Sequence, residues 1–204
     1  MLKYKWIVLV ITGLLFLNAC GQQDEESLNV EEAPVKESGF VAEYDWPLAE
    51  FAAKNEDNED VTLESYKGQP WIMNMIFTNC TTVCLPMTAN MAKLQGMVED
   101  ENLNVQLVSF SVDPNIDTPE VLKDYGGKYE ADFSSWDFLT GYTEDDIKRI
   151  AKSVKTLAEK PEGTDQVTHS TKFFLIDSEG IAVKGYDGVN PPYEEIIRDL
   201  KVVQ

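Results

Sequence analysis

The sequence predicts an α/β domain with a central mixed β-sheet flanked by helices. Short apolar runs suited to buried strands alternate along the chain with segments whose apolar residues recur at helical spacing. Strands that alternate with helices form sheets with parallel strands and with helices on both faces. Near the end of the chain, two strand-like runs are separated only by a short turn, which adds a hairpin. The expected order is therefore β-α-β-α, an inserted strand and helix, and then β-β-α.

The first half of this domain begins with residues 71–77, a mostly apolar run that suits a buried strand. A helix is expected to open at Pro86, because proline fits the first helical position. Its apolar residues fall on one face: Met87, Met91, Leu94 and Val98. Residues 104–112 alternate between apolar and polar and predict a second strand. Thr118 is expected to cap the next helix, with Pro119 as its first residue.

The second half opens with an inserted strand over residues 136–139. Thr143 and Asp146 then resemble a capping box, in which each side chain bonds the backbone amide of the other residue, and they predict the start of a helix. The residues expected on its inward face are Ile147, Ile150, Ala151, Val154 and Leu157. A hairpin and a last helix complete the domain: strands over 172–176 and 181–186, a turn over 177–180, and a helix from about Pro192 with Ile196, Ile197 and Leu200 facing inward.

The first 19 residues are expected to be a lipoprotein signal peptide. Lys3 and Lys5 precede an apolar run over residues 6–17, which is shorter than the ~20 residues that cross a bilayer as a helix. Residues 17–21 resemble a bacterial lipobox, in which Cys20 is the acylated residue. Lipid chains on Cys20 would anchor the protein on the extracytoplasmic face of the bacterial cell membrane. The alternative is an uncleaved signal anchor in which Cys20 has no such role.

A polar, acidic segment over residues 20–39 lacks a hydrophobic period and is expected to be a disordered tether to the domain at 40–204. The whole chain has 17 basic and 36 acidic residues, a net charge of −19, and removal of residues 1–19 with their two lysines leaves about −21. Such a charge repels phosphate backbones, so nucleic acid is not an expected partner. The exported location permits disulfides.

Cys80 and Cys84 lie where the first core strand leads into its helix. Residues four apart on a helix have Cβ atoms about 5–6 Å apart, near enough for a disulfide or for both sulfurs to bind one metal ion. The helix N-terminus is expected to favour the thiolate, the form that both chemistries require. A structural disulfide is the competing interpretation, although closing so short a loop removes little entropy from the unfolded chain.

Two cysteines between the first core strand and its helix indicate a thioredoxin-like fold. In such folds the loop before the strand at 172–176 passes beside the active-site cysteines and ordinarily carries a cis-proline. This chain has no proline between Pro161 and Pro191, and its only histidine, His169, stands at the expected place of that proline. A lone histidine is more often a surface or core residue than a ligand, but here the topology brings an imidazole close to both thiolates.

Two thiolates and one imidazole are too few ligands for a closed structural zinc site, which needs four. Soft sulfur ligands with imidazole in an open site suit copper in either oxidation state. Ligand type alone leaves open a zinc ion completed by a carboxylate or water.

Four segments, at residues 78–84, 111–119, 136–141 and 168–170, resemble the motifs of the Sco/SenC family. Members of this family are copper-binding assembly factors for the CuA centre of cytochrome c oxidase. The resemblance implies that Cys80, Cys84 and His169 are copper ligands and that the partner is the copper-site subunit of the oxidase. The chain departs from the family pattern at Leu85, which separates Cys84 from Pro86.

Asp113 belongs to the Asp-Pro signature of the family and has two interpretations. It either tunes the metal from outside its ligands or is a turn residue that follows a strand. Asp117 is assigned to the start of the next helix. The strand and helix spacing of Met73, Met75, Met87 and Met91 predicts core packing rather than copper ligation.

The leading functional hypothesis is a copper metallochaperone. The alternative is a thiol-disulfide oxidoreductase that reduces the cysteines of the oxidase copper site, with Cys80 and Cys84 as the redox-active pair. A redox or copper sensor uses the same residues, and a thiol peroxidase is less favoured because no peroxide-binding signature is present. The first two roles are compatible, because oxidation to the disulfide would abolish the metal site.

Overall fold

The structure, a computed structural model, describes residues 40–80, 84–161 and 163–204. The predicted signal peptide at 1–19, the predicted tether at 20–39 and Cys20 lie outside the described residues. Within the described part of the chain, none of the helices is long and apolar enough to cross a membrane.

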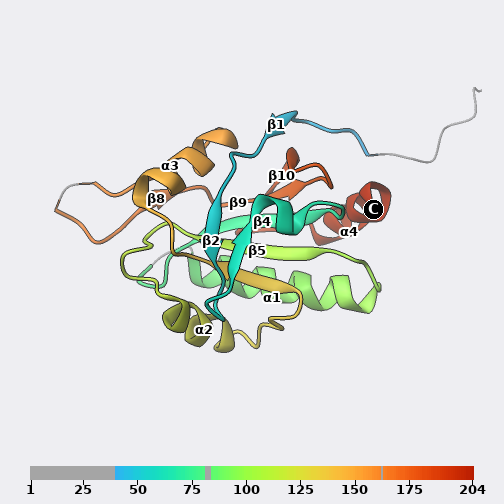
Figure 1. Ribbon diagram of the computed structural model, residues 1–204. Helices are drawn as coiled ribbons and strands as arrows, with labels where there is room; N and C mark the ends of the chain where they lie inside the picture. Colours follow the sequence, from blue (N-terminus) through green and yellow to red (C-terminus); the bar gives the residue numbers. More distant parts are fainter. Residues whose placement is uncertain (1–39, 81–83, 162) are drawn as a thin grey trace, which may run out of the picture. The chain divides into compact units, whose positions relative to one another are not determined.

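A mixed sheet of six strands lies at the centre of the domain, in the order β1-β10-β9-β4-β5-β6 (Figure 1). Three of its strands are parallel: β4 (Trp71–Ile76), β5 (Gln106–Ser111) and β6 (Trp136–Leu139). The others are antiparallel to their neighbours: β9 (Lys172–Ile176), β10 (Ile181–Asp187) and the short edge strand β1 (Trp46–Pro47). The predicted fold class, a mixed sheet flanked by helices, is confirmed.

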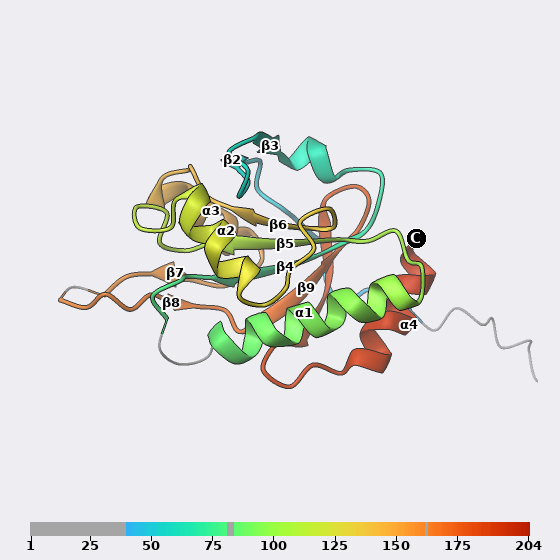
Figure 2. The same ribbon diagram turned by 90° about the horizontal axis from the view of Figure 1, so that it is seen from below.

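Helices cover both faces of this sheet, as Figures 1 and 2 show. One face carries α1 (Cys84–Asp100), α2 (Pro119–Gly127) and α4 (Tyr193–Val203), and the other carries α3 (Glu144–Ser153). Every residue of β4 is buried, with Trp71, Met73 and Met75 in one apolar core and Ile72 and Ile76 in the other. This two-sided burial explains why the strand is almost continuously apolar.

The predicted helix starts at Thr118 and Thr143 are confirmed. Thr118 Oγ1 accepts a hydrogen bond from the amide of Val121, and Pro119 is the first helical residue. Thr143 and Asp146 exchange side-chain to backbone hydrogen bonds, which is the capping box. The four methionines expected in the core are all 0% exposed: Met73, Met75, Met87 and Met91.

Two local predictions are wrong. Helix α1 begins at Cys84 rather than at Pro86, and the proline is tolerated as its third residue because amides of the first turn have no partner within the helix. Leu157 does not continue the buried face of α3 but is 55% exposed. The helix ends at Ser153, and Lys155 adopts a left-handed backbone with φ of 56°, so the chain turns away before Leu157 is reached.

Several short elements were not predicted. A hairpin of β2 (Ala52–Lys54) and β3 (Asp60–Thr62) leads into a 3₁₀ helix, η1 (Leu63–Tyr66). A second small sheet pairs β7 (Ala158–Glu159) with β8 (Thr168–His169) and so carries the only histidine. Strands of two or three residues are too short to show a period in the sequence.

Candidate metal centre

The two cysteines lie together at the N-terminal end of helix α1. Cys80 belongs to a turn that follows β4, in which its amide donates to the carbonyl of Phe77 at 3.3 Å. The amide of Cys84 donates to Cys80 Sγ at 3.4 Å. Both residues are thiols, with Cys80 7% exposed and Cys84 1% exposed. The structure therefore brings the sulfur of Cys80 to the first residue of the helix.

His169 contacts Cys84 from the hairpin of β7 and β8. It belongs to β8, where it pairs with Ala158 of β7. Its Nε2 lies 3.4 Å from Cys84 Sγ, and its ring meets Phe77 edge to face with 5.7 Å between centroids. The ring is half-buried, so its position is set by packing as well as by the strand.

The hydrogen bonds of His169 fix which ring nitrogen carries the proton. Nδ1 lies 2.8 Å from the carbonyl oxygen of Ser170, and a carbonyl can only accept. Nδ1 therefore donates, and in the neutral ring Nε2 keeps its lone pair, which faces Cys84 Sγ. This is the tautomer that a histidine needs in order to bind a metal through Nε2.

Burial favours the uncharged forms of Cys84 and His169. Burial raises the pKa of the Cys84 thiol far above its usual value, and the hydrogen bond with Cys80 raises it further. Burial also lowers the pKa of His169, against the opposing effect of the bond to Ser170. The expectation that the helix N-terminus favours a thiolate at Cys84 is therefore wrong, because desolvation outweighs it.

The three predicted ligands are not gathered into a closed site. Among the residues that the structure describes, no three His, Cys, Asp or Glu side chains lie close enough together to hold a metal ion as they stand. Cys84 touches both of the others: its amide contacts Cys80 Sγ and its sulfur contacts His169 Nε2. A metal ion that uses all three would need these side chains to move closer together.

Asp113 follows β5 and is 4% exposed. Its carboxylate forms an ion pair with Lys160 Nζ at 2.9 Å, and its carbonyl accepts from the amides of Ile116 and Asp117. Asp113 is thus a turn residue, as one of its two interpretations states, and also half of an ion pair. Lys160 follows β7, and nothing in the sequence indicated this contact.

Asp117 was assigned to the start of helix α2, and the structure shows otherwise. Thr118 caps that helix, whereas the side chain of Asp117 is completely buried and faces Thr78 and Ser111 at the ends of β4 and β5. The sequence does not distinguish an aspartate that faces the interior at this position from one that caps a helix.

The hairpin that carries His169 is also tied to the cysteine turn. Asn79, next to Cys80, donates from Nδ2 to Asp165 at 2.9 Å, and Gln166 Nε2 donates to the carbonyl of Asn79 at 3.2 Å. These contacts were not predicted, because they join residues that are 86 and 87 positions apart.

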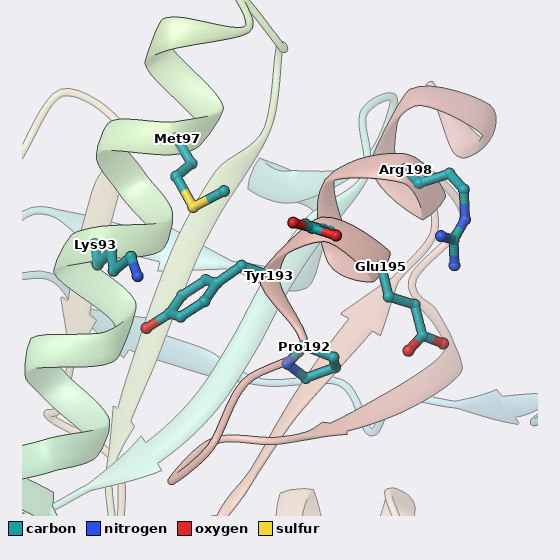
Figure 3. A pocket seen from close by; sticks show the side chains of 7 residues that line it. Lys93, Met97, Pro192, Tyr193, Glu195 and Arg198 are labelled. Atoms are coloured by element: carbon teal, nitrogen blue, oxygen red, sulfur yellow. The ribbon is translucent and has the colours of Figure 1, made fainter.

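A separate pocket lies between helices α1 and α4 (Figure 3). Lys93 lies over the ring of Tyr193, with Nζ 4.3 Å from the centroid. The side chains that line this pocket are Lys93, Met97, Pro192, Tyr193, Glu194, Glu195 and Arg198. Its charges are mixed, and its lining holds none of the three predicted ligands.

Comparison with known proteins identifies the family of the chain. Residues 47–203 match the protein family described as SCO1/SenC. A SCO1/SenC family lipoprotein from Bacillus anthracis has a solved structure with a TM-score of 0.75 and 48% sequence identity, covering 78% of this chain and 95% of that chain. A second solved structure is that of BsSco, described as a member of the Sco family of cytochrome c oxidase assembly proteins with a disulfide switch. It has a TM-score of 0.74 and 43% sequence identity, covering 80% of this chain and 98% of that chain.

A more distant structure contains a metal. Bradyrhizobium japonicum ScoI with copper bound gives a TM-score of 0.64 and 25% identity, covering 78% of this chain and 99% of that chain. The match to the family spans the sheet, the cysteine turn and the histidine hairpin together. By this match, and by its 48% identity to a family member, the chain belongs to the SCO1/SenC family.

Proposed function

We propose that this protein binds copper as cargo through Cys80, Cys84 and His169 and delivers it during assembly of the CuA centre of cytochrome c oxidase. One observation carries the proposal: the lone pair of His169 Nε2 faces Cys84 Sγ at 3.4 Å, while its Nδ1 is already engaged with Ser170. The copper-bound ScoI of Bradyrhizobium japonicum and the description of BsSco as an oxidase assembly protein support it.

The donor set suits copper. Two cysteine sulfurs and an imidazole are ligands that copper accepts in either oxidation state, and three ligands leave a position through which a partner can take the ion. The carboxylate of Asp113 is engaged by Lys160, so Asp113 is not a direct ligand in this proposal. It supports the site from outside through the segment between Asp113 and Asp117.

Burial makes cargo binding depend on proton loss. The high pKa of the Cys84 thiol means that copper must displace a proton to gain this sulfur. In return, the metal supplies the positive charge that stabilises a buried thiolate. A partner that offers better ligands can then take the ion through the open coordination position.

A second candidate function is thiol-disulfide exchange with the oxidase copper site, and the disulfide switch described for BsSco favours it. The two thiols would form one disulfide and give two electrons and two protons to a disulfide of the partner, through a mixed-disulfide intermediate. The raised pKa of Cys84 makes it a poor attacking group and suits it to the resolving step, with Cys80 as the attacking thiol. Metal binding is the better-supported role because His169 Nε2, with its lone pair, faces the sulfur of Cys84.

We also propose that the mature protein is attached to the extracytoplasmic face of the cell membrane by lipid on Cys20. The lipobox-like residues 17–21 support this location, and the relative from Bacillus anthracis is described as a lipoprotein. Copper transfer to an exported oxidase subunit requires this side of the membrane. Lipid on the protein is measured by mass spectrometry of the membrane fraction, where Cys20→Ala should shift the protein into the soluble fraction.

A copper titration of the reduced protein tests the main proposal. The wild-type protein should bind one copper ion with an intense sulfur-to-copper absorption band, and Cys80→Ser, Cys84→Ser and His169→Ala should each weaken binding. Met91→Leu, which removes a buried sulfur from the same helix as Cys84, is the matched control and should bind copper normally. Wild-type binding in His169→Ala would contradict the assigned ligand set.

Delivery and reduction are separated by mixing the protein with a soluble oxidase copper-site fragment. Copper-loaded protein should transfer its ion to a fragment that is already reduced. If copper stays on the loaded protein while the metal-free protein rapidly reduces the oxidised fragment, the delivery role is wrong and the exchange role is correct.

A further inference from the structure

We propose that Asp117 is a positioning residue for the copper site, because its buried carboxylate fixes the turn that carries Cys80 to the ends of β4 and β5. This inference rests on the proposed function for the role of Cys80, and it adds a residue whose side-chain hydrogen bonds go to Thr78 and Ser111.

The carboxylate of Asp117 is 0% exposed and is surrounded by donors. The hydroxyl of Thr78 donates to Oδ1 at 2.5 Å, and the amide of Thr78 lies 3.3 Å from both oxygens. The hydroxyl of Ser111 donates to Oδ2 at 2.5 Å. A buried carboxylate is tolerated only when donors of this kind replace water.

These donors lie where the sheet ends. Ile76 and Ser111 are the last paired residues of β4 and β5, and the carbonyl of Ile76 accepts from the amide of Val112. The amide of Thr78 comes after this last pair and has left the ladder. Asp117 supplies the acceptor that a continuing strand would have provided.

The backbone of Asp117 is also held in place by a hydrogen bond. Its amide donates to the carbonyl of Asp113 at 3.0 Å, which closes the turn between the two residues. Because Thr118 caps helix α2, the helix does not need the side chain of Asp117. The buried carboxylate is therefore explained by what it does for the segment at Thr78.

That segment leads directly to the site. Thr78 is two residues before Cys80, and the residue between them, Asn79, contacts the hairpin that carries His169. Fixing Thr78 therefore sets where the sulfur of Cys80 lies with respect to both other ligands. A metal site needs its donors held to about 0.5 Å, a tolerance that a turn without anchors does not meet.

Thr78→Val and Asp117→Asn test this role. Thr78→Val removes only the hydroxyl donor, and Asp117→Asn presents an amide group to the Thr78 and Ser111 donors. We expect copper affinity to fall about tenfold or more, the loss usual for residues that support metal ligands. In the copper-free protein, we also expect a several-fold change in the alkylation rate of Cys80 relative to Cys84, measured by mass spectrometry. Thr78→Ser should restore wild-type behaviour in both measurements.

Asp199→Asn is the matched control. Asp199 is also a buried aspartate, 1% exposed, but it belongs to helix α4. Its carboxylate accepts hydrogen bonds from Lys184 and Tyr186 of β10. This variant should lower thermal stability and leave both the alkylation ratio and the copper absorption band unchanged. A general loss of stability would therefore not change the alkylation ratio or the copper absorption band, whereas loss of the positioning role would change both.

The outcomes are separable from those of the proposed function. A folded Thr78→Val protein with a wild-type alkylation ratio and wild-type copper affinity would overturn the role of Asp117, even if Asp117→Asn fails to fold. If the wild-type protein binds no copper but Thr78→Val still changes the alkylation ratio, the copper proposal is wrong and the positioning of Cys80 by Asp117 stands.

Discussion

At the scale of single residues, the proposed copper site depends on the contact between Cys84 Sγ and His169 Nε2. The neutral imidazole directs a lone pair at a buried thiol, so each side chain is prepared to bind a metal but carries no charge without one. Desolvation, rather than the helix N-terminus, sets the protonation of Cys84.

Copper affinity should rise with pH, because the raised pKa of Cys84 keeps this thiol protonated in the metal-free protein. The lowered pKa of His169 keeps the imidazole neutral near pH 7, so the displaced protons come from the thiols. The apparent Kd should fall by about tenfold per pH unit for each proton released. Calorimetry in buffers of different ionisation enthalpy measures the number of protons, and Cys84→Ser should release fewer. A Kd that stays constant between about pH 6 and about pH 8 would contradict this account.

The ion pair between Lys160 and Asp113 gives a second prediction at this scale. Lys160→Met leaves the carboxylate of Asp113, which is 4% exposed, without its cation and should lower the free energy of unfolding by about 1–3 kcal/mol. Urea denaturation measures this loss. Combining Lys160→Met with Asp113→Asn should recover part of it, because the uncompensated charge is then removed.

Lys67→Met is the control for this prediction. The ion pair of Lys67 with Glu64 is at the surface, so its loss should change the free energy of unfolding much less than Lys160→Met does. Equal losses in Lys67→Met and Lys160→Met would show that the burial of Asp113 has no energetic consequence.

At the scale of elements, the small hairpin of β7 and β8 determines where the histidine lies. Its contacts through Asp165 and Gln166 with Asn79 join the histidine side of the site to the cysteine side. The site is therefore assembled from two elements that are distant in sequence, and neither of them is part of the central sheet.

Asp165→Ala should loosen this connection without unfolding the domain. Asp165 is exposed, so removal of its hydrogen bond should leave the free energy of unfolding almost unchanged. Copper affinity should nevertheless fall several-fold, and the amides of Ala158 and His169 should exchange with deuterium faster. Asp145→Ala, at an exposed ion pair of α3, is the control and should leave both measurements unchanged. Wild-type exchange and affinity in Asp165→Ala would show that this contact does not position His169.

The sequence is a good guide to elements that carry their own signal. The strand at 136–139, the capping box at Thr143 and the proline after Thr118 are local patterns, and the structure contains each of them. The strands β7 and β8 have two residues each and exist only because they pair with one another, so no local pattern reveals them. Leu157 was misplaced because the left-handed turn at Lys155 ends a helical period that the sequence alone continues.

For the candidate site, the sequence predicts the three proposed ligands but not the side chains that contact the segments around them. Cys80, Cys84 and His169 were identified from spacing, topology and family resemblance. Asp117 and Lys160 were not, because a carboxylate that bonds a strand end and a lysine that reaches a buried aspartate depend on contacts between distant segments. The protonation of Cys84 was also misjudged, because burial cannot be measured from a motif.

At the scale of the whole molecule, the net charge of −19 influences which partners can approach. This charge favours encounter with a partner that presents basic residues around its own copper site. If the oxidase fragment is basic there, its association rate with this protein should fall steeply as salt is added. The dissociation rate should change much less, and stopped-flow measurements separate the two.

The central claim is that one copper ion is held by Cys80, Cys84 and His169 together. X-ray absorption at the copper edge of the reduced protein, loaded with one equivalent of copper, tests it most directly. We predict two sulfur neighbours and one imidazole nitrogen in the wild-type protein, loss of the imidazole signal in His169→Ala, and loss of one sulfur in Cys80→Ser or Cys84→Ser. A spectrum that is unchanged in His169→Ala, or that shows fewer than two sulfur neighbours in the wild-type protein, would contradict the account.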